Sequence, residues 1–279
     1  MFLVECGLAE LGTCLPEMFF QFILSILNGA IEPLLELVKI LLSDPVNTMA
    51  FYPLWAVVIY ILSLFYGLFF LFSGFNFLIS GYDAVKRERA KTGFANIVLM
   101  VLFVQSSFLI YNLITELAGL LSTGVIGLIN PDFFLANADN VNGLGLQIIL
   151  LVPYLITLVI TIALLGLRYL LVMVGVAFFP FGIFFYFISP LQPYGKMIMN
   201  TLMVVIFTPF FASLIIFSAS ALTQLPIFEN WGIILSMITF VTVNLFFLGF
   251  IIFAILKSVN VATNSSIGQA LKQVGGYLY

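Results

Sequence analysis

The residues with the clearest capacity for chemistry are four cations, which lie within six consecutive positions: Lys86, Arg87, Arg89 and Lys91. The chain holds only nine lysines and arginines, so nearly half of them are in this segment. Cations at this density can contact the phosphates of nucleic acids or of anionic lipid headgroups. They can also contact a partner ATPase. Their first predicted role is to fix the cytoplasmic side of the chain, contact with a partner ATPase or with lipid headgroups is secondary, and direct contact with DNA ranks below both.

Two further sets of polar residues recur at helical spacing within long apolar runs, where they could line a path for a transported substrate. The first set is Gln105, Asn112 and Glu116, and the second is Thr157, Thr161 and Arg168. Polar stripes on apolar helices usually face the helix bundle or a water-filled path. Hydrogen bonds between helices explain both stripes equally well. For Arg168, extension to the membrane boundary competes with a role as a buried functional cation.

Several kinds of chemistry are missing from the sequence. The chain has no histidine and two cysteines, Cys6 and Cys14. This composition excludes Cys/His zinc sites, histidine-ligated haem and nucleophilic dyads built on histidine. No phosphate-binding glycine motif is present either. We therefore expect no enzyme activity, no cofactor and no metal. The two cysteines, eight positions apart, are predicted either to form a disulfide in an oxidising compartment or to remain free thiols.

The elements that must position these residues are membrane-spanning helices. Hydrophobic residues make up 63% of the chain and charged residues 8%, which is far from a soluble composition. Five runs are long enough to cross a bilayer as helices: residues 51–81, 94–121, 147–189, 197–222 and 232–256. The sequence therefore predicts an all-α, polytopic transmembrane helical bundle over residues 51–257.

The placement of charge predicts the orientation of this bundle, because cytoplasmic loops are enriched in lysine and arginine. The basic segment 82–93 is expected to be a cytoplasmic hinge between the first two spans. The loops 122–146 and 223–231 and the N-terminal segment 1–50 are then external, and the tail 258–279 is cytoplasmic. The cytoplasmic (inner) membrane is the predicted location.

The run 147–189 leaves the number of spans open. As one helix it would be about 65 Å long, roughly twice the hydrocarbon thickness. We expect a break, either at Arg168, which gives six spans, or near Phe178, followed by a short re-entrant piece around residues 179–182. The second alternative keeps Lys196, Lys257 and Lys272 inside, so charge bias favours five spans.

Within the external segments, two features are candidates for contact. Residues 17–43 carry a polar stripe at spacings of three and four, which predicts an amphipathic helix lying in the outer interface, kinked by Pro33. The central loop contains an apolar patch, Phe133-Phe134-Leu135, which is a candidate contact with lipid or a partner.

Two stretches resemble the TrbL-type inner-membrane channel proteins of conjugation and type IV secretion. They are GYDAVKRERAKTGFANIVLMVLFVQSSFLIYNLI, where a span is followed by a basic hinge, and LRYLLVMVGVAFFPFGIFFYFISPLQPYGKMIMNTL, where an arginine-bearing segment meets Pro180. The resemblance covers residues 51–256. The compact form and the external cysteine-bearing segment are similar to archaeal relatives, including the Ced-type DNA import proteins.

This resemblance implies a homo-oligomeric ring in the inner membrane that forms part of a DNA or protein translocation path or a pilus assembly platform. Its implied partners are secretion ATPases, pilus or core subunits, membrane lipid and DNA in transit. The central external loop, residues 122–145, would meet the translocating substrate. The alternative is a stand-alone channel or secondary transporter for ions or small solutes, with the two polar stripes as its path.

Overall fold

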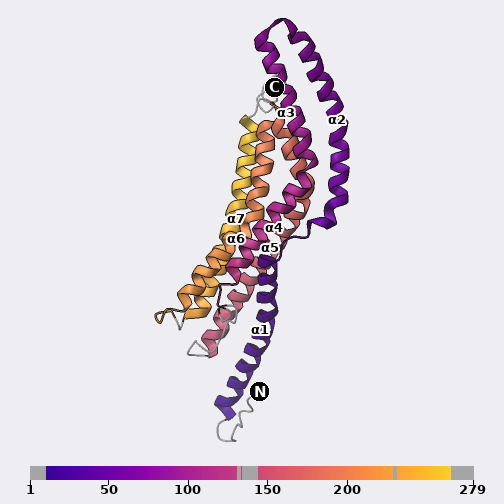
Figure 1. Ribbon diagram of the computed structural model, residues 1–279. Coiled ribbons are helices and arrows are strands. Elements are labelled where there is room, and N and C mark those ends of the chain that lie inside the picture. Colours follow the sequence, from indigo (N-terminus) through magenta and orange to yellow (C-terminus); the bar gives the residue numbers. More distant parts are fainter. Residues whose placement is uncertain (1–10, 131–132, 134–143, 229–230, 265–279) are drawn as a thin grey trace, which may run out of the picture. The chain divides into compact units, whose positions relative to one another are not determined.

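The computed structural model describes residues 11–130, 133, 144–228 and 231–264, and every regular element in them is a helix (Figure 1). Five segments are long and apolar enough to cross a membrane: Thr48–Ile79, Ser107–Ile126, Ile149–Phe187, Gln192–Thr223 and Gly232–Ala254. The chain is therefore an all-helical, multi-pass membrane protein. The all-α class is confirmed, and the candidate spans are as many as the favoured five.

Seven α-helices and two short 3₁₀-helices make up the described chain. In order they are α1 (Leu11–Ser43), η1 (Thr48–Phe51), α2 (Tyr52–Ile79), η2 (Ser80–Tyr82), α3 (Ala84–Gln105), α4 (Ser107–Ile126), α5 (Leu144–Phe187), α6 (Gln192–Thr223) and α7 (Gly232–Asn264). They divide into two compact units. The first unit comprises Met1–Asp44, Gly119–Leu167 and Pro209–Leu248, and the second comprises Pro45–Ala118, Arg168–Thr208 and Gly249–Tyr279.

The core of the first unit is built on the apolar face of α1. Ile31, Leu35, Val38 and Leu42 recur at spacings of four, three and four and are all buried. They share one buried cluster with residues of α5, α6 and α7. The polar residues Glu32, Glu36 and Lys39 lie on the exposed side, as the amphipathic pattern predicted. The helix continues through Pro33.

The second unit contains the α2–α3 hairpin, in which α2 and α3 lie side by side and are joined by η2 and Asp83 (Figure 1). One face of α2, including Leu62 and Tyr66, packs into a cluster with residues of α3, α4, α5 and α6. Most other large apolar side chains of α2 are exposed. An exposed apolar face on a helix of this length is what contact with lipid requires.

The expected break in the long apolar run does not occur, because α5 is one continuous helix from Leu144 to Phe187. A turn at Arg168 or a re-entrant piece at residues 179–182 would leave backbone polar groups unpaired in an apolar setting, and each such group is costly. An unbroken helix avoids that cost, since a helix longer than the bilayer can tilt or project beyond it.

The chain instead reverses direction after α5, at a turn that depends on glycine. Leu191 N–H donates to the Ile188 carbonyl at 2.9 Å, and Gly195 N–H to the Leu191 carbonyl at 3.1 Å. A Cβ atom on Gly195 would overlap the backbone of Tyr186 and the carbonyl of Gly182. Because Gly195 has no side chain, the backbone at the start of α6 can lie directly against the backbone at the end of α5.

The second predicted span is also organised differently from the expectation. A helical break at Ser106 separates α3 from α4, and the candidate span is α4 rather than the whole run from residue 94. The predicted basic hinge is itself mostly helical. Only residues 80–83 form the connection, and the four cations lie in the first turns of α3.

Candidate functional site

The candidate site is the basic end of the α2–α3 hairpin, which we define as residues 80–94. The connection is short and well ordered by hydrogen bonds: Ser80 Oγ donates to the Phe77 carbonyl at 2.8 Å, and Asp83 N–H donates to the Ser80 carbonyl at 3.3 Å. Ser80 is buried while its neighbours are exposed. The chain therefore leaves α2 and enters α3 within four residues.

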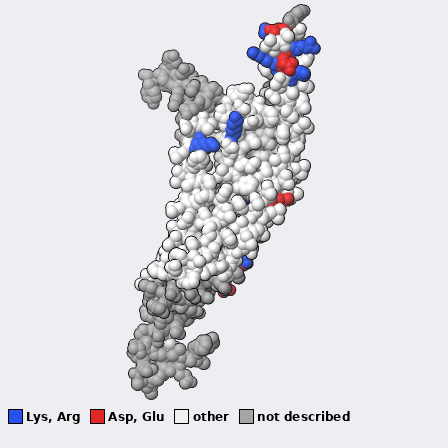
Figure 2. Space-filling view, turned by 60° about the vertical axis from the view of Figure 1, so that its left-hand side comes forward, with Lys and Arg blue, Asp and Glu red and all other residues white. Residues whose placement is uncertain are grey.

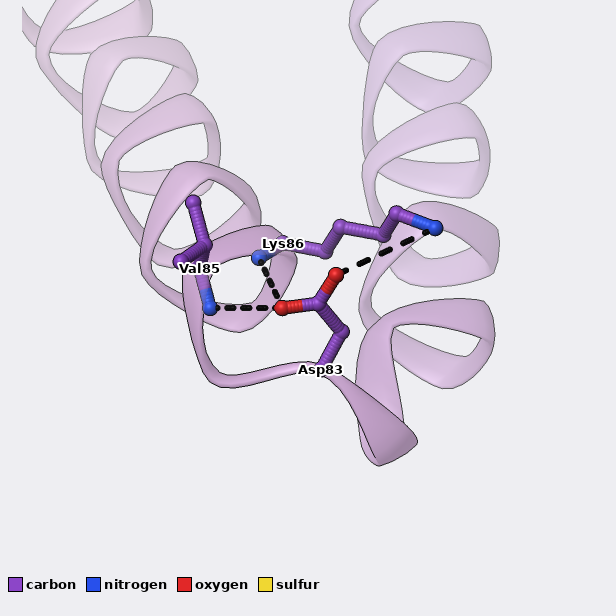
Figure 3. Close-up of polar contacts among 3 residues, drawn as sticks. All are labelled: Asp83, Val85 and Lys86. Atoms are coloured by element: carbon purple, nitrogen blue, oxygen red, sulfur yellow. Dashed lines mark hydrogen bonds and ion pairs between the residues drawn. The ribbon is translucent and has the colours of Figure 1, made fainter.

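Asp83 caps the first turn of α3. Its Oδ1 accepts hydrogen bonds from Val85 N–H at 2.9 Å and from Lys86 N–H at 3.4 Å (Figure 3). Its other oxygen lies 4.0 Å from Lys86 Nζ. Aspartate is among the best residues at this position, because it satisfies backbone donors that the helix leaves free. The negative charge is also favourable near the positive end of the helix dipole.

The four cations immediately after the cap are exposed, together with the acid Glu88. Figure 2 shows basic and acidic atoms gathered at the top of the view, while the rest of the face is mostly uncharged and carries only scattered basic and acidic groups. Cations in the first turn of a helix are unfavourable by about 0.3–1 kcal/mol each, because they face the positive end of the dipole, and Lys86 and Arg87 lie in that turn. Helix stability thus does not explain this placement, which points to a topological or binding role.

The cations separate onto two sides of α3. Arg87 and Lys91, four positions apart, line a groove against α2 together with Glu88. Lys86 and Arg89, three positions apart, line a smaller groove on the other side, with Ser73 and Asn76 of α2. Residues three or four apart share a helix face, so the spacing in the sequence already implies this division.

The residues of the predicted stripe, Gln105, Asn112 and Glu116, lie on two helices. Gln105 ends α3 and is exposed, whereas Asn112 and Glu116 belong to α4 beyond the break. Thr48 Oγ1 donates to Asn112 Oδ1 at 2.5 Å, and Asn112 Nδ2 donates to Glu116 Oε1 at 2.9 Å. Because Thr48 begins the first candidate span, Asn112 and Glu116 lie level with that end of the span.

Other polar and aromatic groups lie near the same end of the first candidate span. Trp55 Nε1 donates to Ser107 Oγ at 2.9 Å, and Asn47 N–H donates to the Tyr169 hydroxyl oxygen at 3.4 Å. The rings of Tyr52 and Trp55 both pack against Phe108. Tryptophan and tyrosine are enriched at membrane–water interfaces. We define the residues of this level, Asn47, Thr48, Tyr52, Trp55, Asn112 and Glu116, as the polar belt.

Arg168 is buried, at 8% exposure, instead of extending to a boundary. Its Nε donates to the Val205 carbonyl at 3.3 Å and its Nη2 to the Ile206 carbonyl at 3.1 Å, both on α6. Pro209 lies inside α6 and has no N–H, so it cannot donate to the Val205 carbonyl four residues earlier. The arginine therefore supplies a donor that the helix lacks.

Tyr111 makes a second close contact in the same unit. Its hydroxyl donates to the Val172 carbonyl at 2.6 Å, and its ring packs against Phe179. A Cβ atom on Gly175 would overlap this hydroxyl. Gly175 is thus the position on α5 that admits the tyrosine.

Thr157 and Thr161 lie in the core of the first unit. Their hydroxyls donate to the carbonyls of Pro153 and Thr157, each at 2.8 Å, and Asn244 Nδ2 of α7 donates to the Thr157 carbonyl at 3.2 Å. Both threonine side chains therefore bond within α5, and the bond to α7 is made by the backbone carbonyl of Thr157. Asn244 was not predicted from the sequence. It is the only amide in the apolar run 232–256, so no second amide at helical spacing marks a shared face with it.

The remaining predicted contacts are only partly described. Phe133 is buried, at 5% exposure, within the core of the first unit, so it is not available on the surface of that unit. Phe134, Leu135 and Cys6 lie outside the described residues. Cys14 lies in α1, where its side chain is not described. Within the described part of the chain, no group of acids, cysteines or histidines is arranged to hold a metal.

Comparisons with known proteins add no relative. The chain matches no family model, no curated protein and no solved structure. The features that bear on its function are therefore the sequence and the geometry of the described helices.

Proposed function

We propose that the chain is a non-enzymatic inner-membrane subunit of a conjugative or type IV secretion-like apparatus, which contacts its partners through the basic end of the α2–α3 hairpin. The supporting observation is the placement of the four cations, which are exposed at the end of a long apolar hairpin although the first two, Lys86 and Arg87, oppose the dipole of α3. In this proposal the subunit forms a homo-oligomeric ring with secretion ATPases and pilus or core subunits.

The two ends of α2 support an orientation for this subunit. As a helix of 28 residues, α2 is about 42 Å long, close to the roughly 40–45 Å of a bilayer with its headgroups. The polar belt lies at its start and the basic end of the hairpin at its finish, so in this proposal the returning crossing runs through α3 into the first turns of α4. The positive-inside rule then assigns the basic end to the cytoplasm and the polar belt to the outside.

The unbroken α5 supports five crossings. One helix crosses the membrane once, so α5 leads from the external loop to the cytoplasm and brings Lys196 to the same side as the basic end. The N-terminus is then external and the C-terminus cytoplasmic. The polar face of α1 is consistent with an external helix at the outer interface, with its apolar face packed on the bundle.

The rival proposal, a stand-alone solute transporter, is less well supported by the polar residues chosen for its path. Arg168 donates hydrogen bonds to two α6 carbonyls, and Asn112 is hydrogen-bonded to both Thr48 and Glu116. The bonds of Arg168 to α6 and of Asn112 to Thr48 join helices to one another. They would have to open before the same groups could bind a solute.

A photo-crosslinking amino acid at Val85, which is 62% exposed at the basic end, tests the proposal in the native host. We expect cross-links to a secretion-type ATPase or another subunit of a translocation machine, and DNA in the same purified fraction. The matched control places the amino acid at Leu64, which is 65% exposed on the apolar part of α2 and should cross-link mainly to lipid. Recovery of neither ATPase nor DNA, together with solute flux by the purified protein in liposomes, would establish the rival.

A further inference from the structure

The larger groove of the α2–α3 hairpin combines a basic rim with an apolar wall. Its volume is about 1180 Å³, which exceeds the roughly 300–1,000 Å³ of ordinary small-molecule sites. The wall is formed by Phe77 and Leu78 of α2 and Phe94 of α3, and the rim by Arg87 and Lys91, with Glu88 beside them. A ligand that fills it must be both anionic and strongly apolar.

Glycines line part of the groove, where α2 and α3 lie apart. Gly74 and Gly81 belong to its wall, and a Cβ atom on either would have no neighbour within 4 Å. The glycines are therefore not required for close helix packing at these positions. They leave space beside Phe77 and Leu78, which are themselves exposed on α2.

The position of the groove along α2 matches the headgroup level of a membrane. Gly81 lies in η2, directly after the end of α2, while Ser73 and Gly74 lie about two turns earlier. The rim cations are thus beside the end of a helix that is about as long as the bilayer is thick. Lysine and arginine near that level are attracted to anionic headgroups by about 1 kcal/mol each.

We propose that this groove binds one anionic phospholipid, with its phosphate at Arg87 and Lys91, its glycerol region beside Phe77 and Leu78, and its acyl chains running past Gly74 and Phe94 toward the bilayer centre. Nucleic acid would use the cations but leave the apolar wall without a partner, and an acidic peptide surface would do the same. The lipid site does not depend on the proposed function, since a lipid can bind here whatever the hairpin contacts beyond the membrane.

The test measures lipids retained by the purified full chain in native mass spectrometry, with phosphatidylglycerol and phosphatidylcholine offered at equal concentration. We expect at least about fivefold more phosphatidylglycerol than phosphatidylcholine on the wild type, because the two cations together favour the anionic headgroup. The double variant Arg87→Gln/Lys91→Gln should lose this preference. Its matched control, Lys86→Gln/Arg89→Gln, removes the same charge from the same turns of α3 and should keep most of it.

A second pair of variants tests the apolar wall with all charges intact. Gly74→Leu fills the groove and should reduce retention of phosphatidylglycerol several-fold. Gly67→Leu, seven positions earlier on α2 and also without a neighbour within 4 Å of its Cβ, should not. Gel filtration of each variant checks that it keeps the fold of the wild type.

Three results would overturn the lipid site. Equal losses in the two charge-pair variants would mean diffuse electrostatic attraction. Unchanged retention in Gly74→Leu would mean that the groove is not occupied. Displacement of the lipid from the wild type by a short duplex DNA would mean that the cations serve nucleic acid.

Discussion

At the scale of single residues, the polar groups of the helices mainly satisfy the backbone and one another. The clearest case is Arg168, whose guanidinium donates to two α6 carbonyls within about one turn of Pro209. A buried charge is expensive, yet here one of its hydrogen bonds meets an acceptor that a proline has deprived of a donor. The residue is thus explained as a structural partner of Pro209.

This explanation predicts that the two residues are energetically coupled. Arg168→Met should lower the free energy of unfolding by about 1–3 kcal/mol, because the Val205 and Ile206 carbonyls lose buried partners. In a Pro209→Ala background the same change should cost less, because the substituted residue restores an N–H donor for the Val205 carbonyl. A double-mutant cycle, measured by thermal unfolding in detergent, should give a coupling of about 0.5–3 kcal/mol. Additive effects of the two substitutions would show that Arg168 acts independently of the proline.

At the scale of elements, the start of α3 determines how the cations are presented. Asp83 fixes the first turn by accepting two backbone hydrogen bonds, and Arg87 N–H donates to the Asp83 carbonyl at 2.9 Å. Without this cap the repulsion of Lys86 and Arg87 by the helix dipole would favour fraying. The cap therefore keeps Arg87 and Lys91 on one side of the helix and Lys86 and Arg89 on the other.

Removing the cap should loosen this turn. Asp83→Ala is expected to cost about 1 kcal/mol, which corresponds to roughly fivefold faster hydrogen–deuterium exchange in a peptide covering residues 84–92. Asp83→Asn keeps a side-chain acceptor and should exchange nearly as slowly as the wild type. Unchanged exchange in Asp83→Ala would mean that the first turn is held by other contacts.

The elements also show where sequence reasoning succeeded and where it failed. The α1 stripe was predicted because its polar and apolar residues keep one helical period through α1. The α5 break was wrongly predicted because length was compared with bilayer thickness, although a long helix that keeps its backbone bonds is less costly than a turn in lipid. The helical break at Ser106 was not predicted, because the spacing of polar residues does not reveal such a break and Ser106 resembles its neighbour Ser107.

At the scale of the whole molecule, composition was sufficient to predict an all-helical membrane protein, because 63% hydrophobic residues leave little alternative. The five candidate spans agree in number with the runs read from the sequence. The grooves of the hairpin could not be predicted, since they depend on how far apart α2 and α3 lie at Gly74 and Gly81. The burial of Phe133 likewise depends on packing between segments distant in the chain.

The central claim at this scale is a five-crossing orientation with the basic end in the cytoplasm. In a background with Cys6 and Cys14 replaced by serine, single cysteines at Lys196 and Ile227 test it. Ile227 is 80% exposed in the connection between α6 and α7, which the orientation places outside. We predict that an impermeant thiol reagent added to intact cells labels Ile227→Cys and labels Lys196→Cys only after permeabilisation. Labelling of Lys196→Cys in intact cells would contradict this orientation, because α5 would then return the chain to the outer side.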